Sequence, residues 1–331
     1  NWKTLQRSKL NQIANTYRLD KMKDDIALSI ANSYLQILFN KEQLKVQKNQ
    51  NLVTKENIKR TQELIEAGTL PAGDIYELQA TDATQQQQII STENALLISK
   101  IALCQTLLLE EYATFDISDE IIDLPMSNVT NETQEAILTK AKESVKDVKI
   151  AMSNVDIAKK DVSISRSSYL PTLSGFFGYN TRWAESTPFN FADQLSLFDG
   201  TAIGLQLNVP ILNGFATRGR VQRAKINQER SEFQLKQAEL DLERNVYQAY
   251  NDVINAKKSF EAAQKTLEAR KQSFNFSKER FDVGLMNSFD FSQASFAYEN
   301  AQSDVLRTKY DYIFRTKILE FYFGIPLIKK Q

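Results

Sequence analysis

The chain has 331 residues, and its 41 lysines and arginines balance its 41 aspartates and glutamates. Because nucleic-acid-binding surfaces usually carry a clear basic excess, this balance predicts no nucleic-acid partner. With no histidine and a single cysteine, Cys104, the chain has almost no ligands for a zinc site or a catalytic His/Cys pair, so neither a metal nor a cofactor is predicted.

Residues 1–110 are predicted to form a hairpin of two long antiparallel helices. Glycine and proline, which destabilise helix interiors, number only 10 and 6 in the whole chain. A seven-residue apolar period, which Asn51 interrupts once, indicates a seam between packed helices. Its apolar members are Ile30, Ile37, Leu44, Ile58 and Ile65. The returning helix is expected from Asp74 to Leu109, and Cys104, among apolar residues on it, is expected simply to be packed.

The turn between these helices has residues suited to both helix ends. Gly68 suits the C-cap of the incoming helix, where a left-handed backbone conformation costs glycine little. Asp74, followed three residues later by Glu77, suits the N-cap of the outgoing helix and gives the pattern of a capping box. A helix cap is therefore the first role predicted for Asp74.

Residues 111–131 are predicted to connect this hairpin to the rest of the chain, and residues 132–168 to form a further helix. Residues 169–215 then contain two stretches in which apolar residues alternate with small or polar ones, as in strands with one apolar face. In the first stretch the apolar face comprises Tyr169, Leu173, Phe177, Tyr179 and Trp183. In the second stretch it comprises Ile203, Leu205, Leu207, Val209 and Ile211, against Ala202, Gly204, Gln206 and Asn208 on the other face.

These strands are long enough to cross a bilayer when tilted, and aromatic residues near their ends resemble an interfacial girdle. A hairpin of a soluble sandwich would alternate in the same way. However, a lone hairpin is marginal in water, and the long helices offer no sheet against which it could pack. A barrel assembled from several chains would close the strand edges. On this interpretation the side chains predicted to face lipid are Ile203, Leu205, Leu207 and Val209.

Residues 216–322 are predicted to form a second hairpin of long helices, followed by a tail at residues 323–331. At 1.5 Å per residue the first of these helices would be about 100 Å long. Its apolar residues recur every seven positions, which predicts a left-handed supercoil with alanines opposite the large side chains. The large members are Val246, Val253, Phe260, Leu267, Phe274 and Phe281, and the small ones are Ala249, Ala256 and Ala263.

The turn of the second hairpin repeats the turn of the first. Gly284 and Asp290 lie 216 residues after Gly68 and Asp74, and Gln293 stands three residues after Asp290, so a C-cap glycine and an N-cap aspartate are predicted again.

The offset of 216 residues indicates an internal duplication. Identical and similar residues recur at this offset without a gap from Arg7 to Asp74, along the first helix and turn of each hairpin, which requires an equal rise along rigid helices. The duplication leads us to expect a stretch equivalent to residues 131–216 before Asn1 in a longer protein, with further strands and any signal peptide.

The order of these features resembles that of the TolC-like outer-membrane efflux proteins. The resemblance depends on the duplication, the Gly-x5-Asp turn in both hairpins, and the segments YLPTLSGFFGYN and LNVPILNGFATRGRVQRAK that lead into and out of the strands. It covers essentially the whole chain. Its specificity lies in the order and spacing of the features together, because no single motif is distinctive.

The resemblance implies a homotrimer in the outer membrane that extends into the periplasm. Each protomer would give four strands to a twelve-stranded β-barrel surrounded by lipid, and helices to a periplasmic α-helical tunnel. The tunnel would dock with a periplasmic membrane-fusion adaptor, which couples it to an inner-membrane transporter of the RND or ABC class. The expected function is a passive exit duct of a tripartite efflux or type I secretion system.

The resemblance also implies roles for the two turns. They would form the periplasmic tip and its aperture, with Gly68, Asp74, Gly284 and Asp290 as the site residues. Met286 stands where some family members have arginine, so an arginine-based lock on a closed tip is not expected. Residues 111–131 and 323–331 would contribute to a belt around the tunnel.

Two other classes of protein differ from this pattern in recognisable ways. An enzyme is not expected, because the sequence has no phosphate-binding glycine loop, no nucleophile elbow and no histidine. A periplasmic coiled-coil adaptor or structural protein is the alternative that stays open. Such proteins have one helical hairpin flanked by β-rich domains, whereas this sequence predicts two hairpins and a single strand pair. A channel needs detergent for extraction from membranes, and a coiled-coil adaptor does not.

Overall fold

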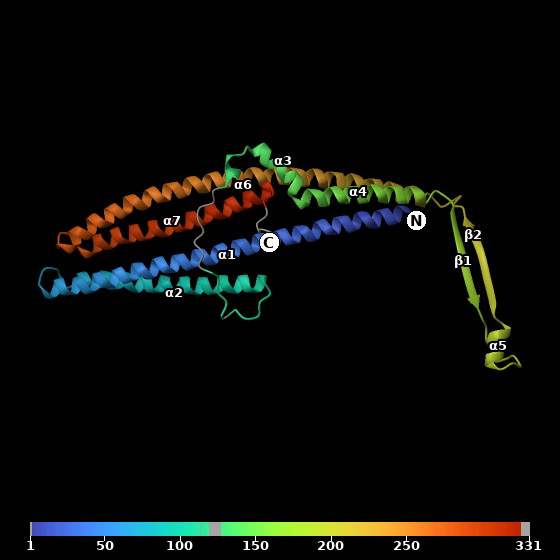
Figure 1. The fold of residues 1–331 in the computed structure, drawn as a ribbon, viewed down its shortest axis with the longest axis horizontal. Coiled ribbons are helices and arrows are strands. Elements are labelled where there is room, and N and C mark those ends of the chain that lie inside the picture. The colour runs from blue at the N-terminus through green and yellow to red at the C-terminus, as the bar shows by residue number, and fades with distance from the viewer. Residues whose placement is uncertain (1, 113, 119–126, 326–331) are drawn as a thin grey trace. The chain divides into compact units, whose positions relative to one another are not determined.

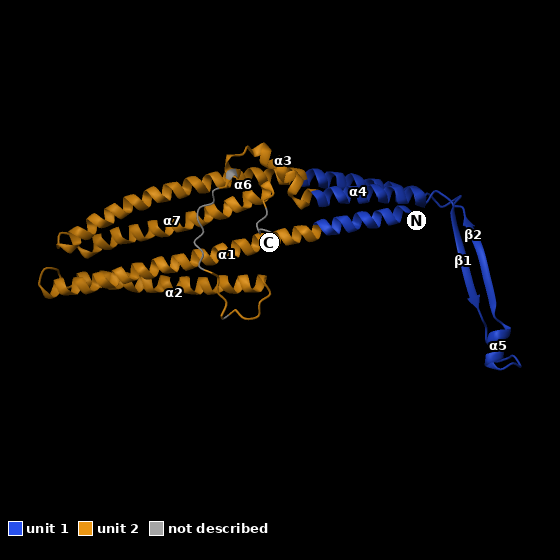
Figure 2. Cartoon of the chain, viewed as in Figure 1, with its two compact units in different colours: residues 1–17, 149–238 blue, residues 18–148, 239–331 orange. Residues whose placement is uncertain are grey.

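The computed structural model describes residues 2–112, 114–118 and 127–325. Over these residues the fold is mainly helical with one small antiparallel sheet, as the sequence predicts (Figure 1). Parts of the predicted connecting segment and tail, residues 119–126 and 326–331, lie outside the described residues. The chain divides into two compact units, the first of residues 1–17 and 149–238 and the second of residues 18–148 and 239–331 (Figure 2).

Long helices make up most of both units. The elements in chain order are α1 (Trp2–Glu66), α2 (Asp74–Thr106), the 3-10 helix η1 (Asn128–Asn131), α3 (Gln134–Ser144), α4 (Lys146–Ser167), β1 (Thr172–Asn180), α5 (Phe191–Leu197), β2 (Gly200–Asn208), α6 (Ala216–Asp282) and α7 (Ser288–Phe323). Within the described ranges, no helix combines the length and apolar character that a membrane span requires.

The single helix predicted over residues 132–168 is wrong, because the structure has two helices there. Val145 separates α3 from α4 with an extended backbone, at φ −70° and ψ 129°. Helix α3 packs on α7, and Ser144 Oγ donates a hydrogen bond to the carbonyl oxygen of Tyr322 at 3.3 Å. Packing on a distant helix therefore outweighs the local helix propensity of this stretch.

The seam predicted along α6 is buried over most of its length. Its buried members are Val246, Ala249, Val253, Ala256, Phe260 and Phe281. Its half-buried members are Ala263, Leu267 and Phe274. Towards the turn, Phe281 stacks on Phe291 of α7 with ring centroids 4.5 Å apart, and Phe274 stacks on Tyr298 at 5.2 Å. The burial predicted for Phe260 is thus confirmed within the single chain.

In the first hairpin, Asn51, the residue that interrupts the apolar seam, makes hydrogen bonds between the two helices. Asn51 is buried, and its Nδ2 donates to Asp82 Oδ1 at 2.6 Å and to Gln85 Oε1 at 3.2 Å. A buried amide with partners escapes the desolvation penalty and favours one register of the two helices. Cys104 of α2 is fully buried, as predicted.

Polar side chains join the first hairpin to α7 of the second. These contacts are hydrogen bonds of side-chain amides, in contrast to the apolar seam of α6. The pairs are Gln43 with Ser303 at 2.8 Å, Gln50 with Gln302 at 2.7 Å, and Gln85 with Glu299 at 2.9 Å.

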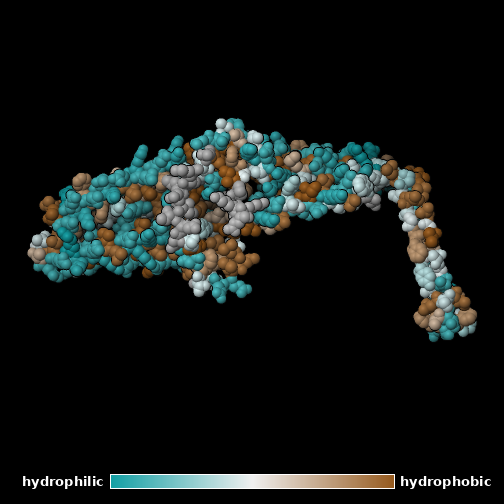
Figure 3. Space-filling model, in the orientation of Figure 1, coloured by the Kyte–Doolittle hydropathy of each residue, from teal (hydrophilic) through white to brown (hydrophobic). Residues whose placement is uncertain are grey.

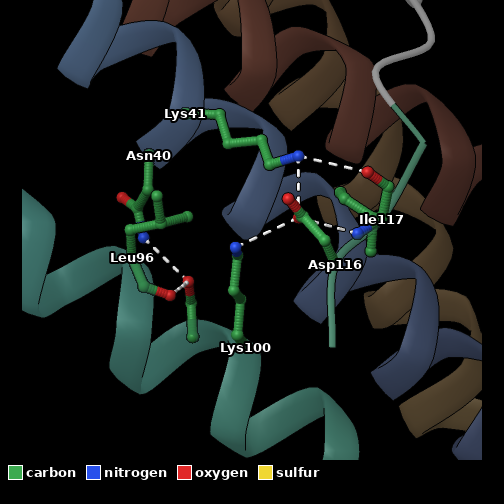
Figure 4. Close-up of polar contacts among 7 residues, drawn as sticks. Asn40, Lys41, Leu96, Lys100, Asp116 and Ile117 are labelled. Carbon is green, nitrogen blue, oxygen red and sulfur yellow. Dashed lines mark hydrogen bonds and ion pairs between the residues drawn. The ribbon is translucent and has the colours of Figure 1, made fainter. Parts of the chain in front are cut away.

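An ion-pair cluster fastens the described part of the connecting segment to the first hairpin (Figure 4). Lys41 of α1 and Lys100 of α2 both donate to Asp116 Oδ1, at 2.8 and 3.1 Å, and Lys41 also donates to the Ile117 carbonyl oxygen at 3.1 Å. Partial burial acts to raise the pKa of Asp116, but the hydrogen bonds from the two lysines and from the Ile117 N–H outweigh it and lower that pKa to about 2. The Ile117 side chain packs against the apolar cluster around Ile313.

The strands pair in the register that gives the predicted faces. Leu173 of β1 lies opposite Leu207 of β2, and apolar residues share that face while small and polar residues share the other. Phe176 is an exception that the sequence analysis did not assign, because it lies on the second face opposite Gly204. A Cβ atom on Gly204 would come within 2.5 Å of the Phe176 ring, so this glycine makes room for the ring.

Candidate functional site

The two turns of the second unit form the candidate site, and their glycines behave as predicted. Gly68 and Gly284 have φ angles of +75° and +74°. In the first turn the Gly68 N–H donates to the Ile65 carbonyl oxygen and the Thr69 N–H to that of Leu64, both at 2.9 Å. The second turn repeats both bonds at 3.0 and 2.8 Å. Each helix therefore ends in a Schellman motif, whose left-handed residue is a glycine because a Cβ would be strained there.

The N-cap predicted at Asp74 is wrong. Asp74 is the first residue of α2, and the N-cap position is Gly73, which supplies no capping side chain. The Asp74 N–H instead donates to the carbonyl oxygen of Pro71 at 3.1 Å. The backbone of the turn thus satisfies a donor that the prediction assigned to a side chain.

The N-cap predicted at Asp290 is also wrong, by three residues. Asn287 caps α7: its backbone is extended, and its Oδ1 accepts the Asp290 N–H at 2.8 Å. Asn287 Nδ2 donates in turn to Asp290 Oδ2 at 2.9 Å. The sequence Asn-Ser-Phe-Asp has an N-cap residue followed three positions later by an acid, and this pattern could have identified Asn287.

A small core holds the two turns together. Leu78 of α2, Phe281 of α6 and Phe291 of α7 form a buried cluster, against which Ile58 and Met286 pack. Met286, at the position where the family resemblance allows an arginine, therefore serves as an apolar packing residue between the two turns.

An ion pair joins the two hairpins beside this core. Arg60 Nε of α1 lies 3.1 Å from Asp282 Oδ1 of α6. The sequence analysis missed this pair, because charged residues on long helices usually lie on solvated faces and no spacing rule links α1 to α6.

The two aspartates lie in the first turns of the outgoing helices. Asp74 is half-buried and Asp290 is exposed. The partial positive charge at a helix N-terminus favours a carboxylate at such positions. No set of three or more His, Cys, Asp or Glu side chains in the described ranges is placed to hold a metal ion. The two turns therefore place one half-buried and one exposed carboxylate at the starts of their outgoing helices.

The strand residues predicted to face lipid are highly exposed in the single chain. Their exposed fractions are 79% for Ile203, 77% for Leu205, 64% for Leu207 and 49% for Val209, which lies just beyond the end of β2. Apolar residues are visible along the hairpin, whereas hydrophilic residues cover much of the visible surface of the helices (Figure 3). An apolar face that the chain itself leaves uncovered marks a surface of interaction.

Comparisons with known proteins agree with this architecture. The family described as "Outer membrane efflux protein" matches residues 137–324, more than half of the chain. The chain is 24% identical over 291 residues to the outer membrane protein TolC of Vibrio cholerae serotype O1, and 24% identical over 243 residues to the proteases secretion protein PrtF of Dickeya chrysanthemi. These alignments cover 87% and 72% of this chain but 65% and 50% of the relatives, so the chain spans less than two thirds of either protein.

The fold is shared with solved structures. The CmeC outer membrane channel of Campylobacter jejuni superposes with a TM-score of 0.77, over 97% of this chain and 67% of that one, at 17% sequence identity. At this identity the likeness concerns the fold alone.

Proposed function

The chain belongs to the outer membrane efflux protein family, and from that premise we propose that the protein acts as a passive exit duct in the outer membrane, extending into the periplasm. The duct would serve a tripartite efflux or type I secretion system. Similarity to TolC and to a proteases secretion protein supports this proposal. In this role the protein has no catalytic residues and requires no cofactor.

The observation that carries the proposal is the strand pair with an uncovered apolar face. A two-stranded hairpin is marginal in water, and here Leu205 and Leu207 are exposed on it. Strands from several chains that close into a barrel would satisfy the backbone groups at both edges and place this face in lipid. We therefore propose a homotrimer whose barrel includes residues 169–215.

The helical hairpins, residues 1–110 and 216–322, would form the periplasmic tunnel. Gly68 and Gly284 allow both hairpins to reverse sharply, and Asp74 and Asp290 would line the aperture between the turns. The polar outer faces suit a water-filled duct. A periplasmic membrane-fusion adaptor and an inner-membrane transporter of the RND or ABC class are the proposed partners.

The test is reconstitution of the full-length protein. We expect extraction from membranes only with detergent, a trimeric mass, and stepwise ion conductance in planar lipid bilayers. Extraction without detergent, or a trimer that conducts no current even with its helical tip removed by a protease, would contradict the duct and favour a coiled-coil adaptor or structural protein.

A further inference from the structure

A groove of about 290 Å³ lies between α2 and α7, the two helices that lead away from the tip. Two carboxylates line it, Glu77 from the first turn of α2 and Glu299 from α7, together with the ring of Phe296. The other lining side chains are hydroxyls, amides and one alanine, and none of the described lining residues is lysine or arginine. The groove therefore has an excess of negative charge and of hydrogen-bond acceptors.

A buried hydroxyl in the groove has no partner. Ser292 lines the groove and is 8% exposed, and its Oγ has no hydrogen bond to any described residue. Buried hydroxyl groups are nearly always hydrogen-bonded, so an orphan of this kind requires an explanation. A ligand in the groove that donates a hydrogen bond would give Ser292 its missing partner.

Hydrogen bonds position the carboxylate of Glu299 to bind a cation. Its Oε1 accepts hydrogen bonds from Gln85 Nε2 at 2.9 Å and from Ser295 Oγ at 3.1 Å. Burial raises the pKa of Glu299, and these two hydrogen bonds offset only part of that effect. Gln85 in turn accepts a hydrogen bond at Oε1 from Asn51 Nδ2, which also donates to the carboxylate of Asp82. A positive charge beside Glu299 would relieve the cost of burying its carboxylate.

The two carboxylates lie at different heights along the groove. Glu77 precedes Gln85, the partner of Glu299, by eight residues on α2, which corresponds to about 12 Å along a helix axis. One compact ion cannot contact both groups, whereas a chain of methylenes with an ammonium group at each end can. Ala80 and Phe296 also line the groove and offer apolar and aromatic contact to such a chain.

We propose that this groove binds a linear aliphatic polyamine, with one terminal ammonium at Glu77, the other at Glu299, and Ser292 Oγ as an additional acceptor. Spermidine, which has nine bonds between its terminal nitrogens, has a suitable length. The ligand bridges α2 of the first hairpin and α7 of the second, so it stabilises their packing. The site is defined by these two helices alone and does not depend on the duct function.

The test is calorimetric titration of the full-length protein in detergent with spermidine. We expect one spermidine per protomer, with the affinity reduced at least about tenfold by Glu299→Gln and by Glu77→Gln, since a hydrogen bond to a charged group is lost in each. Glu261→Gln, on an exposed part of α6 outside the groove, is the matched control and should bind as the wild type does. Absence of binding, or equal affinity in all three variants, would overturn the proposal.

Two further measurements distinguish a defined polyamine site from nonspecific attraction of cations. The shorter 1,4-diaminobutane should bind more weakly than spermidine, and Mg²⁺ at equal concentration should not displace spermidine. Binding should weaken as the pH falls, with proton uptake by Glu299 in the free protein, because the ammonium group favours the ionised carboxylate. If the Glu299→Gln protein does not assemble, the affinity of Glu77→Gln for spermidine tests the proposal alone. If Mg²⁺ displaced bound spermidine as effectively as an equal concentration of added spermidine does, the groove would not be a specific polyamine site.

Discussion

Asp290 carries its negative charge at the start of α7 without capping the helix. The cap is Asn287, so the charge of Asp290 can be removed while the cap remains. We expect Asp290→Asn in the full-length protein to lower the cation-to-anion permeability ratio by at least about twofold, since charges act over about 8 Å at physiological salt and a ring of acids favours cations. Single-channel recording in asymmetric salt measures this ratio. Unchanged selectivity would leave Asp290 without a role in the aperture.

Asn287→Ala is the complementary control. It removes the cap and keeps the charge, so it should cost about 0.5–2 kcal/mol of stability at the tip with little change in selectivity. Asp290→Asn should cost less, about 0.3–1 kcal/mol, through the helix dipole. Thermal unfolding of both variants gives this comparison.

Asp116 makes the attachment of the connecting segment sensitive to acid. Its pKa is lowered from 3.8 to about 2 in the folded protein. A lowered pKa means that the stabilisation is fully present above pH 4 and is lost as the pH falls through about 2. Because the carboxylate is about half exposed, the effect of Asp116→Asn near neutral pH should be about 1 kcal/mol or less.

Hydrogen exchange of residues 114–118 measures this attachment. Asp116→Asn should raise exchange there at pH 7, and the difference between variant and wild type should shrink as the pH falls from 4 through about 2. Asp304→Asn, which removes an exposed pair with Arg307 on α7, is the control and should leave this segment unchanged. A difference that is as large at pH 2 as at pH 7 would show that charge is not the cause.

Among the helices, the seam of α6 was predictable because burial repeats with the helix period. Phe260 is 6% exposed within the single chain. Phe260→Ala should therefore lower the free energy of unfolding by about 3–5 kcal/mol, since the cavity adds to the lost transfer energy. The neighbouring exposed change Glu261→Ala should stay within about 0.5 kcal/mol. Denaturant unfolding followed by circular dichroism compares them, and similar values would contradict the packing of this seam.

The starts and breaks of the helices were less predictable than their faces. Asp74 and Asp290 are each followed three residues later by Glu77 or Gln293, a pattern that predicts a capping box. The structure instead uses the backbone of one turn and Asn287 in the other. Caps depend on the local path of the chain, and the break at Val145 depends on packing against α7. Neither a cap nor a helix break of this kind produces a periodic pattern in the sequence.

At the scale of the whole molecule, the proposal that the protein lies in the outer membrane depends on the strand pair. Leu207 and Gln206 are adjacent on β2 and point to opposite faces, with Leu173 and Ser174 as their cross-strand partners. If the apolar face meets lipid, Leu207→Arg should destabilise the folded protein by about 2–4 kcal/mol near the membrane midplane and Gln206→Arg by much less. Reversible folding into lipid bilayers measures both. Equal destabilisation by the two substitutions would contradict the assignment of the two faces.

The sequence by itself determined the helical hairpins, the strand pair with its two faces, and the glycines of both turns. These features depend on period, spacing and backbone conformation, which are local properties. Only the tertiary structure decided that Met286 packs into the tip core, that Arg60 pairs with Asp282, and that Glu77 and Glu299 share a groove. Those arrangements join residues more than 200 positions apart, and their energies depend on which helices meet rather than on any pattern within one of them.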